Sequence, residues 1–267
     1  AQQLLASMER VLSDALNADS TLDFEALKDR SSYPVPQPQL GFSENAPRSD
    51  DLQYQPRYGC VRSFWPPSRE KVRAEARARF ERDYRRWEEK KNGAQMAFEE
   101  AMERWWSAHD EYVRQRDTAN AAIDSLRQEY ENGTSSRAVV QYCELVLSQS
   151  QYPEYISQMF DIEYNLESKI LVVDLQLPSL DEMPTLVEVK FVQSRNEHQE
   201  KHLASAASVR AYESLLYQMV LRVLHELFSA DAANAIEMIV VNGYVNTIDP
   251  ATGNPNNPCV LTIQANK

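Results

Sequence analysis

The sequence has 267 residues, of which 43% are hydrophobic and 25% are charged, and its formal net charge is −12. This balance excludes a chain that is disordered throughout, and no apolar run reaches the length of about 18 residues that a membrane-spanning helix needs. Residues 132–267 alone carry eight basic and sixteen acidic side chains. Because an acidic surface repels phosphate groups, we expect this last part to bind nucleic-acid backbones poorly.

The cysteines and the N-terminus indicate the cellular compartment. Cys60, Cys143 and Cys259 are odd in number, far apart, and form no C-x-x-C pair. The first residues lack the basic region and apolar stretch of a signal peptide. We therefore expect a cytoplasmic protein without a disulfide framework, a zinc knuckle or a cofactor of its own.

The N-terminal part divides into a helical segment, residues 1–32, and a linker, residues 33–67. Apolar residues at helical spacing predict an amphipathic helix over residues 2–17, with one face made of Leu4, Leu5, Met8, Leu12 and Leu16. The linker holds seven of the 13 prolines. This composition predicts an extended segment, in which Tyr54, Tyr58, Phe64 and Trp65 could pack against another part of the protein.

Residues 68–131 predict a long charged helix with a coiled-coil character. The segment has no proline, and its single glycine is Gly93. Aromatic and apolar residues recur at heptad spacing, including Phe98, Met102, Trp105, His109 and Tyr112. The pattern fits one straight helix or an antiparallel hairpin broken near Asn92-Gly93. We expect this helix to join copies of the chain into a homo-oligomer.

Residues 132–267 predict an α/β domain, of the α+β kind, in which helices pack on a sheet. The expected order is αβββαββ. The elements are a helix over 137–148, strands over 159–164, 169–177 and 185–193, a helix over 201–228, and strands over 236–245 and 259–264.

This order matches the core of the PD-(D/E)xK nucleases, which hold Mg²⁺ on two acids and place a lysine near the attacking water. Asp174 lies in the second predicted strand, and Glu188 and Lys190 lie on one side of the third. Asp174 and Glu188 are therefore candidate Mg²⁺ ligands, with Lys190 as the third catalytic residue. A strand with one solvent-facing side shows the same pattern, and the apolar residues around Asp174 favour this structural interpretation.

Two further patterns have a functional and a structural interpretation. His198 and His202 are four residues apart, which on a helix is metal-ligand spacing, although no third ligand is evident. Arginines in the long helix could follow the phosphate backbone of DNA, namely Arg73, Arg77, Arg82, Arg85 and Arg86. Acidic residues between them favour a solvated, salt-bridged helix instead.

Several segments resemble a bacterial family of Mrr-like restriction endonucleases. They are residues 160–164, 173–178, 183–185, 211–213 and 224–228, and residues 241–253, which read Val-Asn-Gly-Tyr-Val-Asn-Thr-Ile-Asp-Pro-Ala-Thr-Gly. The last segment is the most specific, and the proline-rich linker and charged helix also fit the family. The resemblance covers most of the chain.

The resemblance implies that the chain is the N-terminal regulatory or assembly module of a defence protein that cuts foreign DNA. In this family a nuclease domain with its own Asp and Gln-x-Lys motif follows such a module, so DNA would be contacted through the full-length protein. Gln264-Ala265-Asn266-Lys267 has one residue too many for that motif. Two alternatives stay open: a Mg²⁺-dependent DNase that uses Asp174, Glu188 and Lys190, or a structural coiled-coil protein.

Overall fold

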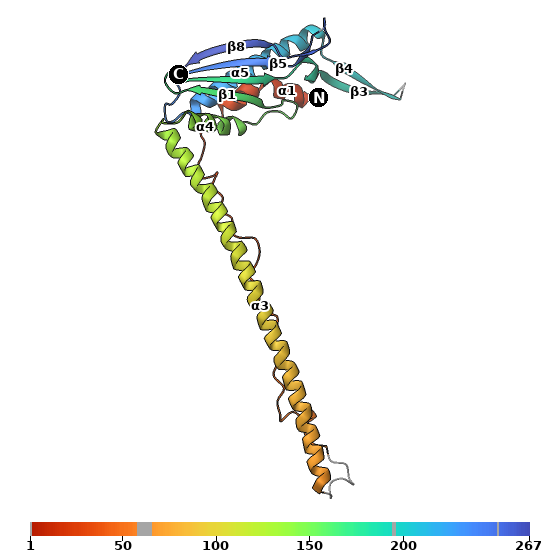
Figure 1. The fold of residues 1–267 in the computed structure, drawn as a ribbon. Coiled ribbons are helices and arrows are strands. Elements are labelled where there is room, and N and C mark those ends of the chain that lie inside the picture. The colour runs from red at the N-terminus through yellow and green to blue at the C-terminus, as the bar shows by residue number, and fades with distance from the viewer. Residues whose placement is uncertain (1, 58–65, 194–195, 250) are drawn as a thin grey trace. The chain divides into compact units, whose positions relative to one another are not determined.

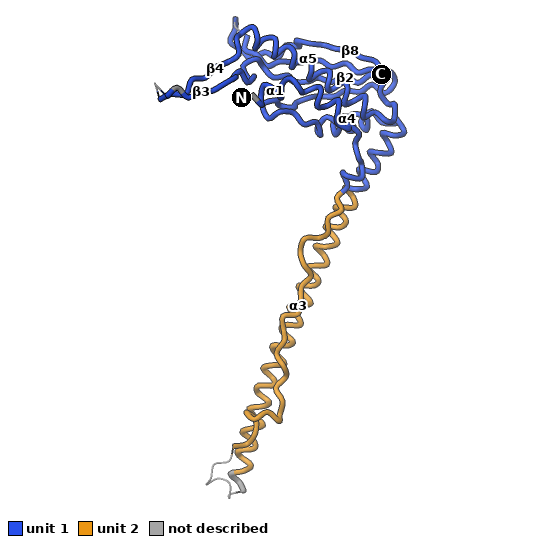
Figure 2. The backbone as a smooth tube through the Cα atoms, turned by 180° about the vertical axis from the view of Figure 1, so that it is seen from behind, with its two compact units in different colours: residues 1–28, 120–267 blue, residues 29–119 orange. Residues whose placement is uncertain are grey.

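The computed structural model describes residues 2–57, 66–193, 196–249 and 251–267. The chain forms two compact units, coloured separately in Figure 2: residues 29–119 make unit 2, and residues 1–28 join residues 120–267 in unit 1. The N-terminal segment is thus part of the α/β unit, whereas the sequence suggested a segment of its own. Helices and strands together give the expected α+β fold class.

Helix α3 runs without a break from Pro66 to Glu131, so the structure has one continuous helix where the sequence also allowed a hairpin. Helix-favouring Ala, Glu, Arg, Gln and Lys dominate the segment. Side chains one turn apart also bond, as Gln95 Nε2 does with Glu99 Oε1 at 2.8 Å. A glycine inside a helix costs only about 1 kcal/mol relative to alanine, so Gly93 does not end it.

In unit 2 the heptad-spaced residues of α3 pack against an extended segment of the same chain. We call this segment, residues 29–57, the strap; Figure 1 shows it running beside α3. The ring of Tyr33 lies 5.7 Å from that of Trp105, 5.6 Å from His109 and 5.4 Å from Tyr112. The predicted linker is therefore a bound strap, and it covers the stripe on which a coiled-coil partner was expected.

Two tryptophans of α3 hold the strap in the same way. The indole Nε1 of Trp105 donates to the carbonyl oxygen of Val35, and that of Trp87 donates to Glu44, both at 2.9 Å. Trp87 and Trp105 are eighteen positions apart, which is five helical turns and about 27 Å, so both lie on one side of α3. Nine residues of polyproline II chain span about 28 Å. The strap from residue 35 to residue 44 therefore matches the spacing of the two indoles.

Near its end the strap is held by Tyr54, the last residue of a short 3-10 turn (Leu52–Tyr54). The ring of Tyr54 packs 5.4 Å from that of Phe80, and its hydroxyl donates to Asp83 at 3.1 Å. Tyr54 was one of four aromatic residues expected to pack; Tyr58, Phe64 and Trp65 lie outside the described residues. Among the described hydrophobic residues of unit 2, only Tyr54 and Ala76 are buried, so the remaining stripe stays partly accessible to solvent.

Unit 1 contains a four-stranded sheet with the order β1-β2-β5-β8. Its strands are β1 (Met159–Asn165), β2 (Ile170–Leu177), β5 (Met238–Val245) and β8 (Cys259–Asn266). The antiparallel pairs β1-β2 and β5-β8 confirm the two predicted hairpins. The central pair, β2 and β5, is parallel.

Helices α4 (Ser136–Ser148) and α5 (Ser205–Ala230) cover one face of this sheet and build the core with it, as Figure 1 shows. The short helices α1 (Gln2–Glu9) and α2 (Val11–Leu16) pack against α5. Alternate residues of β2 and β5, such as Val173 and Val241, are fully buried against residues of α5 such as Leu215. No helix among the described residues is long and apolar enough to cross a membrane.

The N-terminal helix departs from its predicted form. It is broken at Arg10 into α1 and α2, and the core receives Met8, Val11 and Ala15. Leu4 and Leu16, predicted to lie on the buried face, are 45% and 56% exposed. At Arg10 the backbone dihedrals (φ −110°, ψ 2°) depart from helical values, so a periodicity read over one continuous helix does not hold for the residues that follow.

A second, separate hairpin consists of β3 (Leu186–Val192) and β4 (Glu197–His202). The sequence predicted the third strand but not the fourth, because Glu-His-Gln-Glu-Lys-His has no apolar alternation. The predicted start of the following helix at Lys201 is wrong, since α5 begins at Ser205. β3 pairs with β4 and is not a member of the four-stranded sheet.

Candidate binding site

The structure places the three predicted catalytic residues on two different sheets. Asp174 lies on β2 of the four-stranded sheet, whereas Glu188 and Lys190 lie on β3 of the separate hairpin. Glu188 and Lys190 face each other, with Nζ and Oε2 3.5 Å apart, and the lysine side chain is 69% exposed. Among the described residues, no group of three or more His, Cys, Asp or Glu side chains is placed to hold a metal ion.

Asp174 takes part instead in a polar row across the face of the sheet opposite the helices. The amide of Asn242 on β5 donates to Asp174 at 2.8 Å and accepts from the hydroxyl of Thr262 on β8 at 3.0 Å. Asp161 on β1 is the direct partner of Asp174 in the strand register. The row links neighbouring strands through hydrogen bonds, which is a structural role for Asp174.

The two histidines and the helical arginines do not gather into sites. His198 and His202 lie on a strand, where four residues span about 13 Å, so their predicted helical ligand spacing is wrong. The arginines Arg73, Arg77, Arg82, Arg85 and Arg86 are all exposed. At 3.6 residues per turn, the last three point away from the side that carries Arg73 and the aromatic stripe. The five therefore form no single basic stripe along α3.

A cavity of about 830 Å³ opens in unit 1 where the two parallel strands end. The last residues of β2 and β5, Leu177 and Val245, are paired, so both segments leave the sheet at the same level. In open sheets of this kind, the carboxyl ends of parallel strands are the usual place for a ligand. The cavity volume lies within the range of about 300–1,000 Å³ that small-molecule sites occupy.

One wall of the cavity follows β2. A 3-10 turn (Leu180–Glu182) is closed by a capping box, in which the Ser179 backbone N–H donates to Glu182 Oε2 at 2.7 Å. Beside it, the hydroxyl of Tyr212 on α5 donates to the carbonyl of Pro178 at 3.0 Å. Burial, together with the nearby carboxylate of Glu182, raises the pKa of Tyr212, so its hydroxyl stays a donor.

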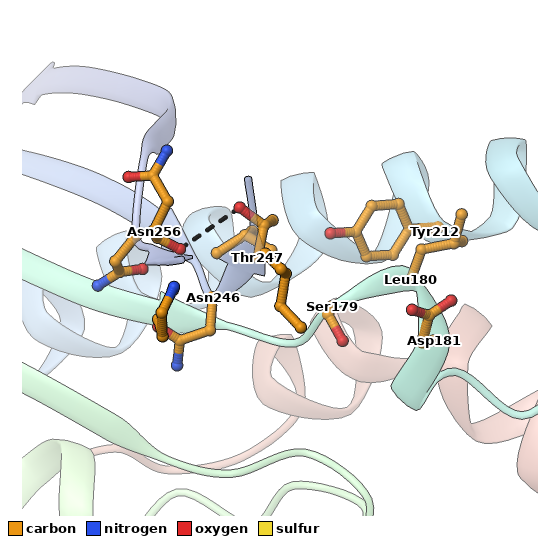
Figure 3. A pocket seen from close by; sticks show the side chains of 11 residues that line it. Ser179, Leu180, Asp181, Tyr212, Asn246, Thr247 and Asn256 are labelled. Carbon is orange, nitrogen blue, oxygen red and sulfur yellow. Dashed lines mark hydrogen bonds between the residues drawn. The ribbon is translucent and has the colours of Figure 1, made fainter. Parts of the chain in front are cut away.

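The opposite wall is a hairpin that follows β5, made of β6 (Thr247–Ile248) and β7 (Pro255–Asn256). At its turn, Asp249 accepts from the backbone N–H of Ala251 at 2.9 Å and from the hydroxyl of Thr252 at 2.8 Å. These two bonds lower the pKa of Asp249. Figure 3 shows Asn246, Thr247 and Asn256 on this side of the cavity and Leu180 and Tyr212 on the other.

The ends of β2 and β5 that lead into the cavity, which we call its base, are held by polar and steric contacts. Asn257 Nδ2 donates to Gln176 Oε1 at 3.2 Å, and Gln176 Nε2 donates to the Tyr244 carbonyl at 3.0 Å. On β5, Gly243 leaves room for Leu177, because a Cβ at this position would overlap Leu177 Cδ1. Leu177 is 2% exposed, so it has little freedom to move away.

No pattern in the sequence indicated this cavity. Its walls come from two segments about seventy residues apart, which meet only because β2 and β5 pair in parallel. The wall beside β5 is made by the end of that strand and the residues after it, namely Val245, Asn246, Thr247 and Ile248.

Comparison with known proteins adds no relative: no protein-family model, no curated protein and no solved structure matches the chain.

Proposed function

We propose that this chain is the recognition and assembly module of a host-defence protein of the Mrr-like restriction endonuclease kind, and that its ligand binds in the cavity beyond β2 and β5. The observation that carries the proposal is that the segment with the most specific resemblance also forms part of the cavity wall. The segment with the most specific resemblance, residues 241–253, supplies Asn246, Thr247 and Ile248 to the cavity wall.

The cavity is suited to recognition because hydrogen bonds fix the backbone of its walls while polar side chains that line it remain exposed. The Ser179 capping box, the Asp249 turn and the Gln176 contacts hold the backbone of both walls. Asn246, Thr247 and Asn256 line the hollow and remain exposed. A fixed frame with exposed polar groups binds a ligand at low cost in conformational entropy.

In this proposal DNA cleavage belongs to the full-length protein, and α3 with its strap serves as a stiff assembly element. The strap covers part of the heptad-spaced stripe. A homo-oligomer through α3 would therefore use the rest of the helix surface or require the strap to leave. Sedimentation velocity of the purified chain tests this part, and a monomer at all concentrations would contradict it.

The cavity is tested in bacterial cells that carry the complete protein and are challenged with phage. Asn246→Trp fills the cavity from an exposed position, so the fold should survive the change. The matched control is Asn266→Trp, because Asn266 is also exposed and pairs with Met238 at the opposite end of β5. We expect cells with Asn246→Trp to lose protection and cells with Asn266→Trp to keep it.

Equal protection by both variants would reject the cavity as the recognition site. No protection by the wild-type protein against any phage tested would reject the defence role itself. Protein abundance in the cells and the melting temperature of each purified variant show whether a loss of protection reflects unfolding.

A further inference from the structure

The charge of the cavity limits what it can bind. Among the described residues that line it, the only carboxylate is Asp181, and none is Lys, Arg or His. Two further carboxylates, those of Glu182 and Asp249, lie on the segments that form its walls. A phosphate group would enter this hollow against negative charge and would meet no side-chain cation. The ligand is therefore one without phosphate.

The hydrogen-bonding groups of the cavity are mainly side-chain amides. Asn246 and Asn256 line the same wall, and each amide offers a donor and an acceptor in one plane. No bond from another described residue occupies either of these side-chain amides. Such a group pairs best with a ligand edge that also carries a donor next to an acceptor, as nucleobases do.

The facing wall is apolar and partly aromatic. The Tyr212 hydroxyl already donates a hydrogen bond to the Pro178 carbonyl oxygen. Tyr212 therefore offers the cavity mainly its ring. Leu180 lies beside it in Figure 3. A hollow with amides on one side and an aromatic ring on the other fits a flat, polar-edged molecule.

We propose that the cavity binds a nucleoside or free nucleobase, with the ring between the two walls and its polar edge on Asn246 and Asn256. This inference rests on the proposed function, since it names the ligand class of the same cavity. Ile248 and Val245 supply further apolar contact at the carboxyl end of β5. The absence of a cation from the lining makes the site select against the corresponding nucleotides.

The test is titration of the purified chain with adenosine, guanosine, cytidine, thymidine and uridine, and with their 5′-monophosphates, by calorimetry and saturation-transfer NMR. We expect at least one nucleoside to bind, and its monophosphate to bind about tenfold more weakly. Asn246→Ala and Asn256→Ala should each weaken binding about fivefold or more, as the loss of a two-point base contact does. Asn266→Ala, at the opposite end of β5, should leave the affinity unchanged.

The proposal is overturned if no nucleoside binds at a concentration of about 10 mM, which exceeds the dissociation constant of even a weak specific site, about 1 mM. It is also overturned if the monophosphates bind as tightly as the nucleosides, or if Asn266→Ala weakens binding as much as Asn246→Ala. If no nucleoside binds but Asn246→Trp still abolishes protection in cells, the ligand class is wrong and the cavity stands. If Asn246→Trp has no effect in cells while nucleosides bind, the ligand class stands and the defence role of the cavity falls.

Discussion

The indole nitrogen of Trp105 donates a hydrogen bond to the carbonyl oxygen of Val35, seventy positions earlier in the chain, at 2.9 Å. The same bond recurs between Trp87 and Glu44. In both places an aromatic side chain two positions before the acceptor, Tyr33 or Phe42, packs against the same tryptophan. Unit 2 is thus held together by a repeated contact between an extended segment and a helix.

Replacing both indole donors should loosen the strap without unfolding α3. Trp87→Phe and Trp105→Phe keep an aromatic ring but remove one hydrogen bond each, which costs about 0.5–1.5 kcal/mol. We expect the amides of the strap to exchange with solvent roughly tenfold faster in the double variant, while the exchange of unit 1 is unchanged. Hydrogen exchange followed by mass spectrometry measures both units in one experiment.

Trp106→Phe is the matched control for the strap. Trp106 is adjacent to Trp105 but 49% exposed, and its indole nitrogen bonds to no described part of the strap. Strap exchange in this variant should equal that of the wild type. If Trp106→Phe accelerates exchange as much as the double variant, the tryptophan bonds are not what holds the strap.

Gly243→Ala should destabilise unit 1 at the base of the cavity. The added Cβ would overlap Leu177 Cδ1, and inserting a methyl group into a packed site costs about 1–3 kcal/mol. Urea denaturation should show this loss, and a second change, Leu177→Val, should recover part of it by removing the overlapping atom.

Gly93→Ala provides the opposite control, because the residue is helical and an added Cβ there would meet no atom within 4 Å apart from its chain neighbours and the backbone of its own helix. Alanine should stabilise this position by about 0.5–1 kcal/mol. A Gly243→Ala variant as stable as the wild type would mean that Leu177 can move aside, and the base of the cavity would then be adaptable.

Sequence periodicity predicted those parts of the fold whose signals are local. The β1-β2 hairpin is an example: alternating residues flank a turn in which Asn165 Oδ1 accepts from the backbone N–H of Glu167 and Ser168, both at 3.0 Å. The helical state of residues 68–131 follows from their composition, although composition did not distinguish one helix from a hairpin. Such elements depend on residues a few positions apart, and these are visible in one sequence.

The parts that depend on distant residues were not predictable. A heptad stripe predicts that one side of α3 is covered, but it does not say by which element. A second helix would satisfy the pattern, and so does the strap. β4 has no apolar alternation and exists through its pairing with β3. The cavity requires the parallel pairing of β2 and β5, which no local pattern encodes. The nuclease hypothesis placed Glu188 beside Asp174, but β3 leaves the sheet that contains Asp174.

Asp174→Ala and Lys190→Ala should differ in their effect on stability. Removing Asp174 leaves the amide of Asn242 without its acceptor on β2 in a half-buried position, which costs about 1–3 kcal/mol. Lys190 is mostly exposed, and its one ion pair among the described residues is with Glu188, so its loss should change the free energy of unfolding by less than about 1 kcal/mol. Urea denaturation of both variants makes the comparison.

A plasmid-cleavage assay with Mg²⁺ separates this structural role from the nuclease alternative. We expect the purified chain and Lys190→Ala to give the same result. Cleavage by the wild type that disappears in Lys190→Ala would make Asp174, Glu188 and Lys190 a catalytic site. The two residues of β3 would then have to approach Asp174 during the reaction.

The stability of unit 1 should fall at alkaline pH. Burial raises the pKa of the Cys143 thiol and of the Tyr130, Tyr142 and Tyr152 hydroxyls, so these groups stay protonated in the folded protein. In the unfolded chain they ionise near their ordinary values of about 8.5 and 10. The unfolded state therefore binds fewer protons above these values, and stability decreases with rising pH. We expect a free energy of unfolding that is flat from about pH 7 to 8.5 and declines above it.

Thiol labelling at pH 8 tests separately whether the Cys143 and Cys259 thiols are buried. Cys259 is exposed and should react with a thiol reagent at once, whereas Cys143 is 1% exposed and should react only after unfolding. Cys143→Ala removes one of the titrating groups and should make the alkaline decline shallower. Rapid labelling of Cys143 in the native protein would mean that α4 separates readily from the core. The pKa of the thiol would then be similar in the folded and unfolded states, so only the tyrosines would contribute and the decline in stability should begin at a higher pH.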